Sequence, residues 1–188
     1  MSTTATATTT ATDLGSGTWV IDPVHSRVGF EVAHLGISTF RGSFGEFEGR
    51  IVTAGGSLAS VEGTIAPASV DVGDGQLAGH LRSEDFFATE RHPVASFRST
   101  SVQETGEGSY RLDGELTLRG VTRPLGLDVD VDGVGVGPDS SGRIALSGRG
   151  ELDRTEYGIE WNSRLANGAS MVGERVRLVL SVEAAEAE

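Results

Sequence analysis

The chain has 188 residues, a net charge of −12 and no cysteine, and its 15 strongly basic residues are all arginine. This length is typical of one domain with a sizeable core, and the lack of cysteine and lysine excludes disulfides, thiolate catalysis, Schiff-base chemistry and a P-loop lysine. The negative charge opposes binding to nucleic acid, because that binding depends on a concentrated positive patch.

The two ends of the chain differ in composition from the middle. Residues 1–16 are rich in Thr and Ala and have little to bury, so we expect this segment to be disordered. It lacks the basic and apolar regions of a signal peptide, and no segment reaches the roughly 20 apolar residues that span a membrane. We therefore expect a cytoplasmic protein with one folded domain over residues 17–183 and a disordered acidic tail over 184–188.

Strands are predicted along most of the folded domain, from β-branched and aromatic residues in its first half and from apolar and polar alternation in its second. They cover residues 19–21, 28–32, 44–53 and 94–102 and four segments that begin at Leu112, Leu125, Ile144 and Val176. Eight antiparallel strands with one apolar face are able to close into a barrel. The predicted fold class is therefore all-β, a single antiparallel eight-stranded barrel.

One helical stretch interrupts the strand pattern. Gly75–Phe87 is predicted as a short helical insertion that lies across the barrel or plugs one end of it. The seven phenylalanines of the chain fill a dry core or line a pocket, and the pattern alone favours the core.

Two motifs imitate ligand-binding loops. Residues 73–78 match a relaxed dinucleotide fingerprint, but the antiparallel strands that follow do not form the βαβ series that this motif needs. Residues 128–133 imitate an EF-hand loop, but aspartates two positions apart share one face of a strand, and no helices flank them. Both motifs are interpreted as structural, and no cofactor is predicted.

Histidine-based sites also have a structural interpretation. His80 and Glu84 have the i, i+4 spacing of a shared metal, yet two ligands do not complete a site, and no metal is predicted. His25 and Ser26 are neighbours without an evident orienting partner, so the segment 22–26 is interpreted as a turn held by side-chain hydrogen bonds. No catalytic residue is predicted.

Several spaced motifs follow one another in order between Trp19 and Glu183. They are Trp19–Ser26, Phe30–His34, Arg41–Phe44 with Phe47–Gly49, His80–Phe87, Pro93 with Phe97–Ser99, Gly114–Thr122, Arg154 with Tyr157-Gly158, and Val172–Glu174. Through these motifs the chain resembles the YceI-like family of polyisoprenoid-binding, lipocalin-like proteins. The resemblance implies a lipocalin-like barrel with a helical insertion, an isoprenoid tail in its bore, frequent homodimers and no catalytic residues.

The resemblance also places ten residues around the bore or its mouth as candidate ligand-binding residues. They are Phe30, His34, Phe44, His80, Leu81, Phe86, Phe87, Phe97, Leu116 and Leu118. The chain departs from the family pattern before Gly79, where Leu77-Ala78 replace an Arg-Asp pair and remove a polar headgroup contact. A headgroup contact from His34, His80, Arg82 or Arg41 is left open.

The predicted function is non-enzymatic binding, storage or transport of an isoprenoid, an isoprenoid quinone or another long-chain amphiphilic lipid. Each buried methylene contributes about 0.8 kcal/mol, so a long tail supplies affinity with little polar recognition. Two alternatives stay open: a lipid-modifying enzyme that uses His34 or His80 as a base, and a barrel with a dry core that binds a partner protein. Neither nucleic acid nor a membrane-spanning role is expected.

Overall fold

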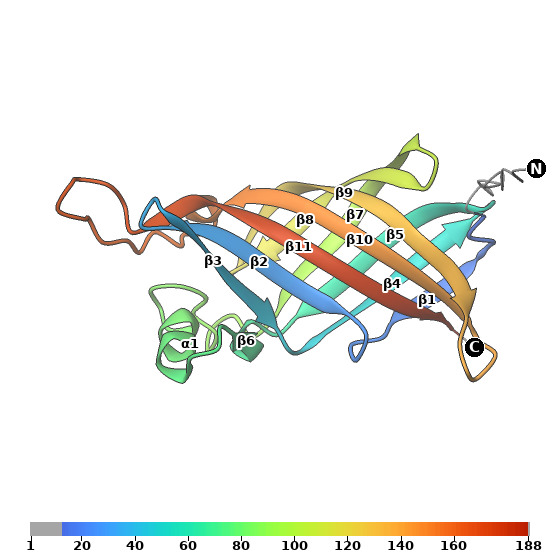
Figure 1. Ribbon diagram of the computed structural model, residues 1–188, viewed down its shortest axis with the longest axis horizontal. Helices are drawn as coiled ribbons and strands as arrows, with labels where there is room; N and C mark the ends of the chain where they lie inside the picture. The colour runs from blue at the N-terminus through green and yellow to red at the C-terminus, as the bar shows by residue number, and fades with distance from the viewer. Residues whose placement is uncertain (1–12, 188) are drawn as a thin grey trace, which may run out of the picture.

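The structure is a computed structural model and describes residues 13–187. Eleven antiparallel strand segments curl into a long barrel, with α1 at one end and the end of the last strand at the other (Figure 1). The strands are β1 (Gly17–Ile21), β2 (Arg27–His34), β3 (Ser38–Phe44), β4 (Phe47–Ala54), β5 (Ser57–Ile65), β6 (Val70–Asp71), β7 (Ala95–Gly106), β8 (Ser109–Leu118), β9 (Val121–Val136), β10 (Gly142–Asp153) and β11 (Val172–Glu186). The helix is α1 (Gly75–Arg82), and 3-10 turns lie at Pro67–Ser69 and Arg154–Tyr157.

Six of these segments are halves of interrupted strands. One edge of β11 pairs with β2 through residues 172–181 and with β1 through residues 184–186, so β1 and β2 form one broken strand. In the same way β3 and β4 pair with β2 and β1, and β6 continues the line of β5 along β3. The ring closes where β1 pairs with both β4 and β11, which confirms the predicted eight-stranded antiparallel barrel.

The individual strands differ from the prediction in several places. Residues 38–43 of β3 and the short strand β6 were not predicted as strands, and the predicted segment 44–53 joins the end of β3 to β4. Residues 19–21 and 28–32, predicted as two strands, are the two halves of one. The strand β5 was not predicted, because a bulge breaks its alternation: Val52 pairs with Ser60 but Thr53 pairs with Leu58. The extra residue between them shifts the inward positions by one, and a period of two is no longer visible in the sequence.

The helix is shorter than the predicted Gly75–Phe87. It begins where the Asp74 carboxylate accepts a hydrogen bond from the Leu77 N–H at 2.8 Å, and it ends at Arg82. Ser83 has an extended backbone and its hydroxyl donates to the His80 carbonyl at 2.7 Å, which ends the helical hydrogen bonding. The prediction for residues 83–87 is therefore wrong, and these residues form turns over the barrel end.

Both predicted disordered ends are too long. Leu14 is buried at 3% exposure and its N–H donates to the Gly56 carbonyl at 3.0 Å. At the other end β11 continues to Glu186, where Ala184 is fully buried and pairs with Ile21. The predicted disorder is wrong for residues 13–16 and 184–186, because pairing with distant segments orders them, and residues 1–12 lie outside the described residues.

Candidate functional site

A cavity of about 360 Å³ occupies the bore of the barrel. The ten predicted ligand-binding residues all line it, from β2, β3, β7, β8, α1 and the turns after α1. They are Phe30, His34, Phe44, His80, Leu81, Phe86, Phe87, Phe97, Leu116 and Leu118. The fold therefore brings these residues together around one space, while their contact with a ligand stays a prediction.

The end of the bore near the β1–β11 pairing is filled by side chains. Leu14, Trp19, Leu58, Tyr110 and Ile144 are buried in one cluster there but do not line the cavity. The Trp19 indole N–H donates to the Thr53 hydroxyl at 3.0 Å, so the buried N–H group has a hydrogen-bond partner within this cluster. The cavity consequently opens toward the opposite end, where α1 and the loop after β10 lie (Figure 1).

Strand alternation makes the wall of the cavity apolar. Along β2 the side chains of Val28, Phe30 and Val32 face the bore, while Glu31 between them pairs with Arg41 at 2.9 Å on the outside. The same alternation operates along β8 and β11, so the bore is lined mainly by Leu, Val, Ile and Phe. Such a surface favours an apolar chain over water.

Three rings frame the mouth of the cavity. The His80 ring lies 5.0 Å from the Phe86 ring and 5.0 Å from the Trp161 ring, both in edge-to-face geometry. The His80 imidazole also contacts the Asp85 carboxylate at 3.1 Å. Trp161 was missed in the sequence analysis, because the loop that carries it has no periodic pattern; its signal was its rarity, as one of two tryptophans.

Two glycines hold bore-facing rings against the barrel wall. A Cβ atom on Gly42 would lie 2.7 Å from Cε1 of Phe30, and one on Gly114 would lie 2.6 Å from Cζ of Phe97. Real side chains do not approach so closely, so each ring occupies the space that any larger residue would take. The rings therefore lie along the wall instead of across the bore.

Arg154 is a buried cation at the mouth, with only 4% of its surface exposed. Its guanidinium donates to the carbonyl oxygens of Gly173 at 2.8 Å, Ile159 at 2.7 Å and Trp161 at 3.0 Å. Burial lowers the pKa of the guanidinium, although it stays charged because arginine does not deprotonate in proteins. Arg154 thus anchors both ends of the loop that carries Trp161, a role that no sequence pattern indicated.

His80 and Glu84, which have the spacing of a shared metal, are not brought together. Glu84 forms an ion pair with Arg91, which lowers the pKa of the glutamate, while His80 faces Asp85. The EF-hand imitation is likewise a strand surface, where Asp128 pairs with Arg111 at 2.9 Å. Both sites are therefore explained by surface ion pairs.

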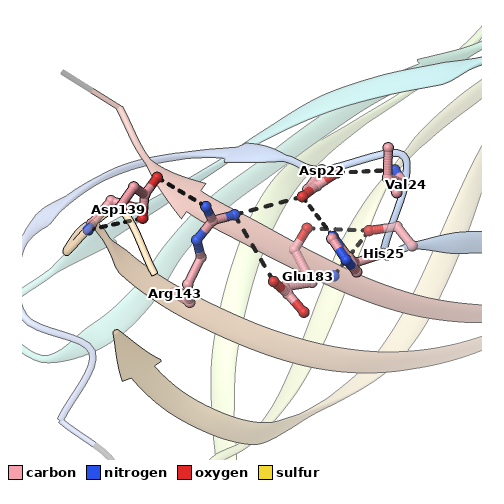
Figure 2. A network of polar contacts seen from close by, with 8 residues as sticks. Asp22, Val24, His25, Asp139, Arg143 and Glu183 are labelled. Carbon is pink, nitrogen blue, oxygen red and sulfur yellow. Dashed lines mark hydrogen bonds and ion pairs between the residues drawn. The ribbon is translucent and has the colours of Figure 1, made fainter. Parts of the chain in front are cut away.

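The turn at residues 22–26 is held by side-chain hydrogen bonds, as predicted (Figure 2). The Ser26 hydroxyl donates to the Glu183 carbonyl at 3.1 Å and accepts from the Glu183 N–H at 2.9 Å. His25 and Asp22 are 2.9 Å apart, and this hydrogen bond raises the pKa of His25 and lowers the pKa of Asp22. These bonds hold the turn between β1 and β2 against β11.

Asp22, His25 and Glu183 have ligand atoms within 4.8 Å of one another, close enough for a metal ion. The Arg143 guanidinium lies in the same network, 3.5 Å from Asp22 and 3.9 Å from Glu183 (Figure 2). Its positive charge already offsets part of the charge of the two carboxylates and would repel a second cation. We interpret the cluster as an ion-pair network.

Within residues 13–187 the one α-helix has eight residues, so no helix there is long and apolar enough to cross a membrane.

Comparisons with known proteins agree with this architecture. A UPF0312 protein of Ectopseudomonas mendocina is 34% identical over 161 residues, covering 85% of this chain and 81% of its own. The crystal structure of a Campylobacter jejuni YCEI protein has a TM-score of 0.71 and 26% identity, covering 83% of this chain and 90% of its own. A domain from Saccharophagus degradans shares the fold at a TM-score of 0.67 and 17% identity, covering 90% of this chain and 98% of its own.

A family model also matches most of the chain. The model of the YceI-like domain matches residues 19–184, which span the barrel from β1 to the C-terminal part of β11. The matched region contains the cavity, its aromatic mouth and the stapled turn at residues 22–26. The chain therefore belongs to the YceI-like domain family.

Proposed function

We propose that this protein binds a polyisoprenoid or a similar long-chain amphiphilic lipid in its bore and stores or carries it without chemical change. The observation that carries the proposal is the apolar cavity. Packed side chains close the bore at one end of this cavity, and three rings frame its other end. This shape suits a ligand whose tail enters first and whose polar head stays at the mouth.

The energetics support a tail-binding role. A volume of about 360 Å³ lies near the lower end of the roughly 300–1,000 Å³ of ligand pockets. Burial of each methylene contributes about 0.8 kcal/mol, so a tail of a few isoprene units supplies useful affinity without any hydrogen bond. The structural relative from Saccharophagus degradans is described as a polyisoprenoid binding domain, which supports the same ligand class.

Native mass spectrometry of protein purified without detergent, followed by solvent extraction, tests the proposal. We expect a bound mass in the range of isoprenoid lipids, or uptake of added isoprenoid alcohol or quinone. Leu116→Trp, which places a large ring inside the bore, should abolish this uptake, while Glu115→Trp on the outer face should preserve it. A stable protein that is empty and takes up none of these lipids would refute the proposal.

One observation favours the alternative of a lipid-modifying enzyme. His80 at the mouth contacts Asp85 at 3.1 Å, and a carboxylate that orients a histidine is a common feature of general-base catalysis. Incubation of the protein with extracted lipids, with products followed by mass spectrometry, tests this alternative. Turnover by the protein that is lost in His80→Ala would support it, and unchanged lipids would count against it.

The open bore counts against the other alternative, a barrel filled by its own side chains. The homodimer and the cytoplasmic location stay predictions, which analytical ultracentrifugation and cell fractionation would test.

A further inference from the structure

Two loops project from the mouth end of the barrel and lie against each other. One is the turn at residues 34–38 between β2 and β3, and the other is the loop at residues 161–171 before β11 (Figure 1). The Leu35 N–H donates to the Met171 carbonyl at 2.7 Å, which joins the turn to the base of the loop. We call these two segments the rim loops.

The longer rim loop is a folded hairpin. Its arms are joined by a hydrogen bond from the Met171 N–H to the Ser163 carbonyl at 2.8 Å, and its tip by one from the Leu165 N–H to the Ala169 carbonyl at 2.9 Å. The Arg154 guanidinium anchors its base through the Trp161 carbonyl at 3.0 Å. The rim loops therefore present a defined surface.

The charge of the rim loops differs from that of the chain. The protein has 27 acidic residues, yet none lies between Glu31 and Glu46 or between Glu160 and Glu174. Arg164 is the one formally charged residue of the rim loops. A surface without carboxylates is able to approach lipid phosphates, whereas the rest of this protein is acidic, since the whole chain has a net charge of −12, and is repelled by them.

The rim loops also expose apolar side chains. Ile37 is 85% exposed at the tip of the shorter loop, and Leu165 lies partly exposed near the tip of the longer one. Trp161 is half-buried at the mouth, and tryptophan is enriched where proteins meet the membrane interface. An apolar, carboxylate-free tip is the composition that a bilayer surface accepts.

The cavity opens on this surface. His34, Trp161 and Met171 of the rim loops line the cavity. A long isoprenoid tail has a large cost in water, so direct passage from a bilayer into the bore avoids that cost. We propose that the rim loops dock on a lipid bilayer surface and that the ligand enters and leaves the bore through this contact, an inference that rests on the proposed function.

Exposed carboxylates border this surface, since Glu160 and Glu174 flank the longer rim loop in the sequence. Glu84 pairs with Arg91 in the turns after α1, and the Arg154 guanidinium at the base of the longer loop lies close enough to Glu174 to attract its charge. The rim loops themselves contain no carboxylate, so an anionic bilayer repels them less than it repels the acidic remainder of the chain.

Vesicle experiments on the full chain test the docking surface. The rate of transfer of a fluorescent isoprenoid lipid between vesicles of phosphatidylcholine and phosphatidylglycerol is measured, together with co-flotation of the protein. Ile37→Asp puts a charge at the rim, and the matched control Val136→Asp puts the same charge on a side chain that is 75% exposed at the opposite end. We expect Ile37→Asp to lower transfer and co-flotation about tenfold and Val136→Asp to leave both unchanged.

Binding of a short isoprenoid alcohol, followed by Trp161 fluorescence, separates docking from the proposed function. Equal loss of transfer in Ile37→Asp and Val136→Asp, or a transfer rate that does not rise with vesicle concentration, would overturn the docking surface while bore binding stands. A wild-type protein that floats with vesicles through Ile37 but leaves the bore empty would refute the proposed function alone. Self-association that Ile37→Asp abolishes, without any co-flotation, would identify the surface as a dimer contact and overturn docking.

Discussion

At the scale of single residues, the width of the bore depends on two glycines. Gly42 and Gly114 leave room for the rings of Phe30 and Phe97 to lie along the wall, at distances that no Cβ atom would permit. Nothing in the local sequence distinguishes these glycines from those in turns, because their role depends on a neighbouring strand. The glycines are thus as important to the cavity as the aromatic residues that line it.

Gly42→Ala should narrow the bore. The new methyl group would displace the Phe30 ring from the wall into the cavity, where it excludes roughly two methylenes and weakens isoprenoid binding about tenfold. Fluorescence titration with an isoprenoid alcohol measures the change. Gly133→Ala is the control, because a Cβ atom there meets nothing within 4 Å, and unchanged affinity in Gly42→Ala would contradict this role.

At the scale of elements, the barrel depends on where its strands are interrupted. The turn at residues 22–26 lets β1 and β2 follow the same edge of β11, and Ser26 bonds to both backbone polar groups of Glu183. Next to it, His25 and Asp22 form a hydrogen-bonded pair. Glu183 also raises the pKa of His25, whereas Arg143 lowers it.

This pair makes stability depend on pH. Because Asp22 raises the pKa of His25, the stabilisation is complete below the ordinary histidine value of about 6.5 and is lost as pH rises through the raised pKa. Urea unfolding should therefore show that His25→Gln lowers the free energy of unfolding more at pH 6 than at pH 9. In an Asp22→Asn background, which keeps the oxygen that caps the Val24 N–H, the effect of His25→Gln should change much less with pH, since only the weaker influence of Glu183 and Arg143 is left.

At the scale of the whole molecule, closure of the barrel joins the two ends of the chain. Trp19 pairs with Glu186 and Ile21 with Ala184. Ala184 is fully buried in the cluster of side chains that fills this end of the bore. The pairing closes the ring at this end, where packed side chains fill the bore, and the cavity extends from there to the rim loops.

A chain that ends at Glu183 should lose this closure. It lacks the residues of β11 that pair with β1, and we expect the free energy of unfolding to fall by about 2 kcal/mol or more, since backbone hydrogen bonds and buried apolar surface are lost. Urea unfolding measures the loss, and a chain that ends at Ala187 is the control. Equal stability of the two chains would show that the β1–β11 pairing contributes nothing to the barrel.

The sequence by itself determined the all-β fold class, the antiparallel barrel and the family. Alternation along one strand is a local property, so β8, β9, β10 and β11 were visible without knowledge of their partners. Spaced motifs from Trp19 to Glu183 identified the family and ten lining residues.

Only the tertiary structure decided where the strands break, how the ends are ordered and what frames the mouth. Three features depend on pairing with another strand: the bulge in β5, the burial of Ala184, and the space that Gly42 leaves for the Phe30 ring. Arg154 and Trp161 lie in segments without periodicity, and their roles arise from carbonyl oxygens and rings that meet only when the barrel closes. Pairing between distant residues leaves no local pattern, which is why these features could not be predicted from the sequence.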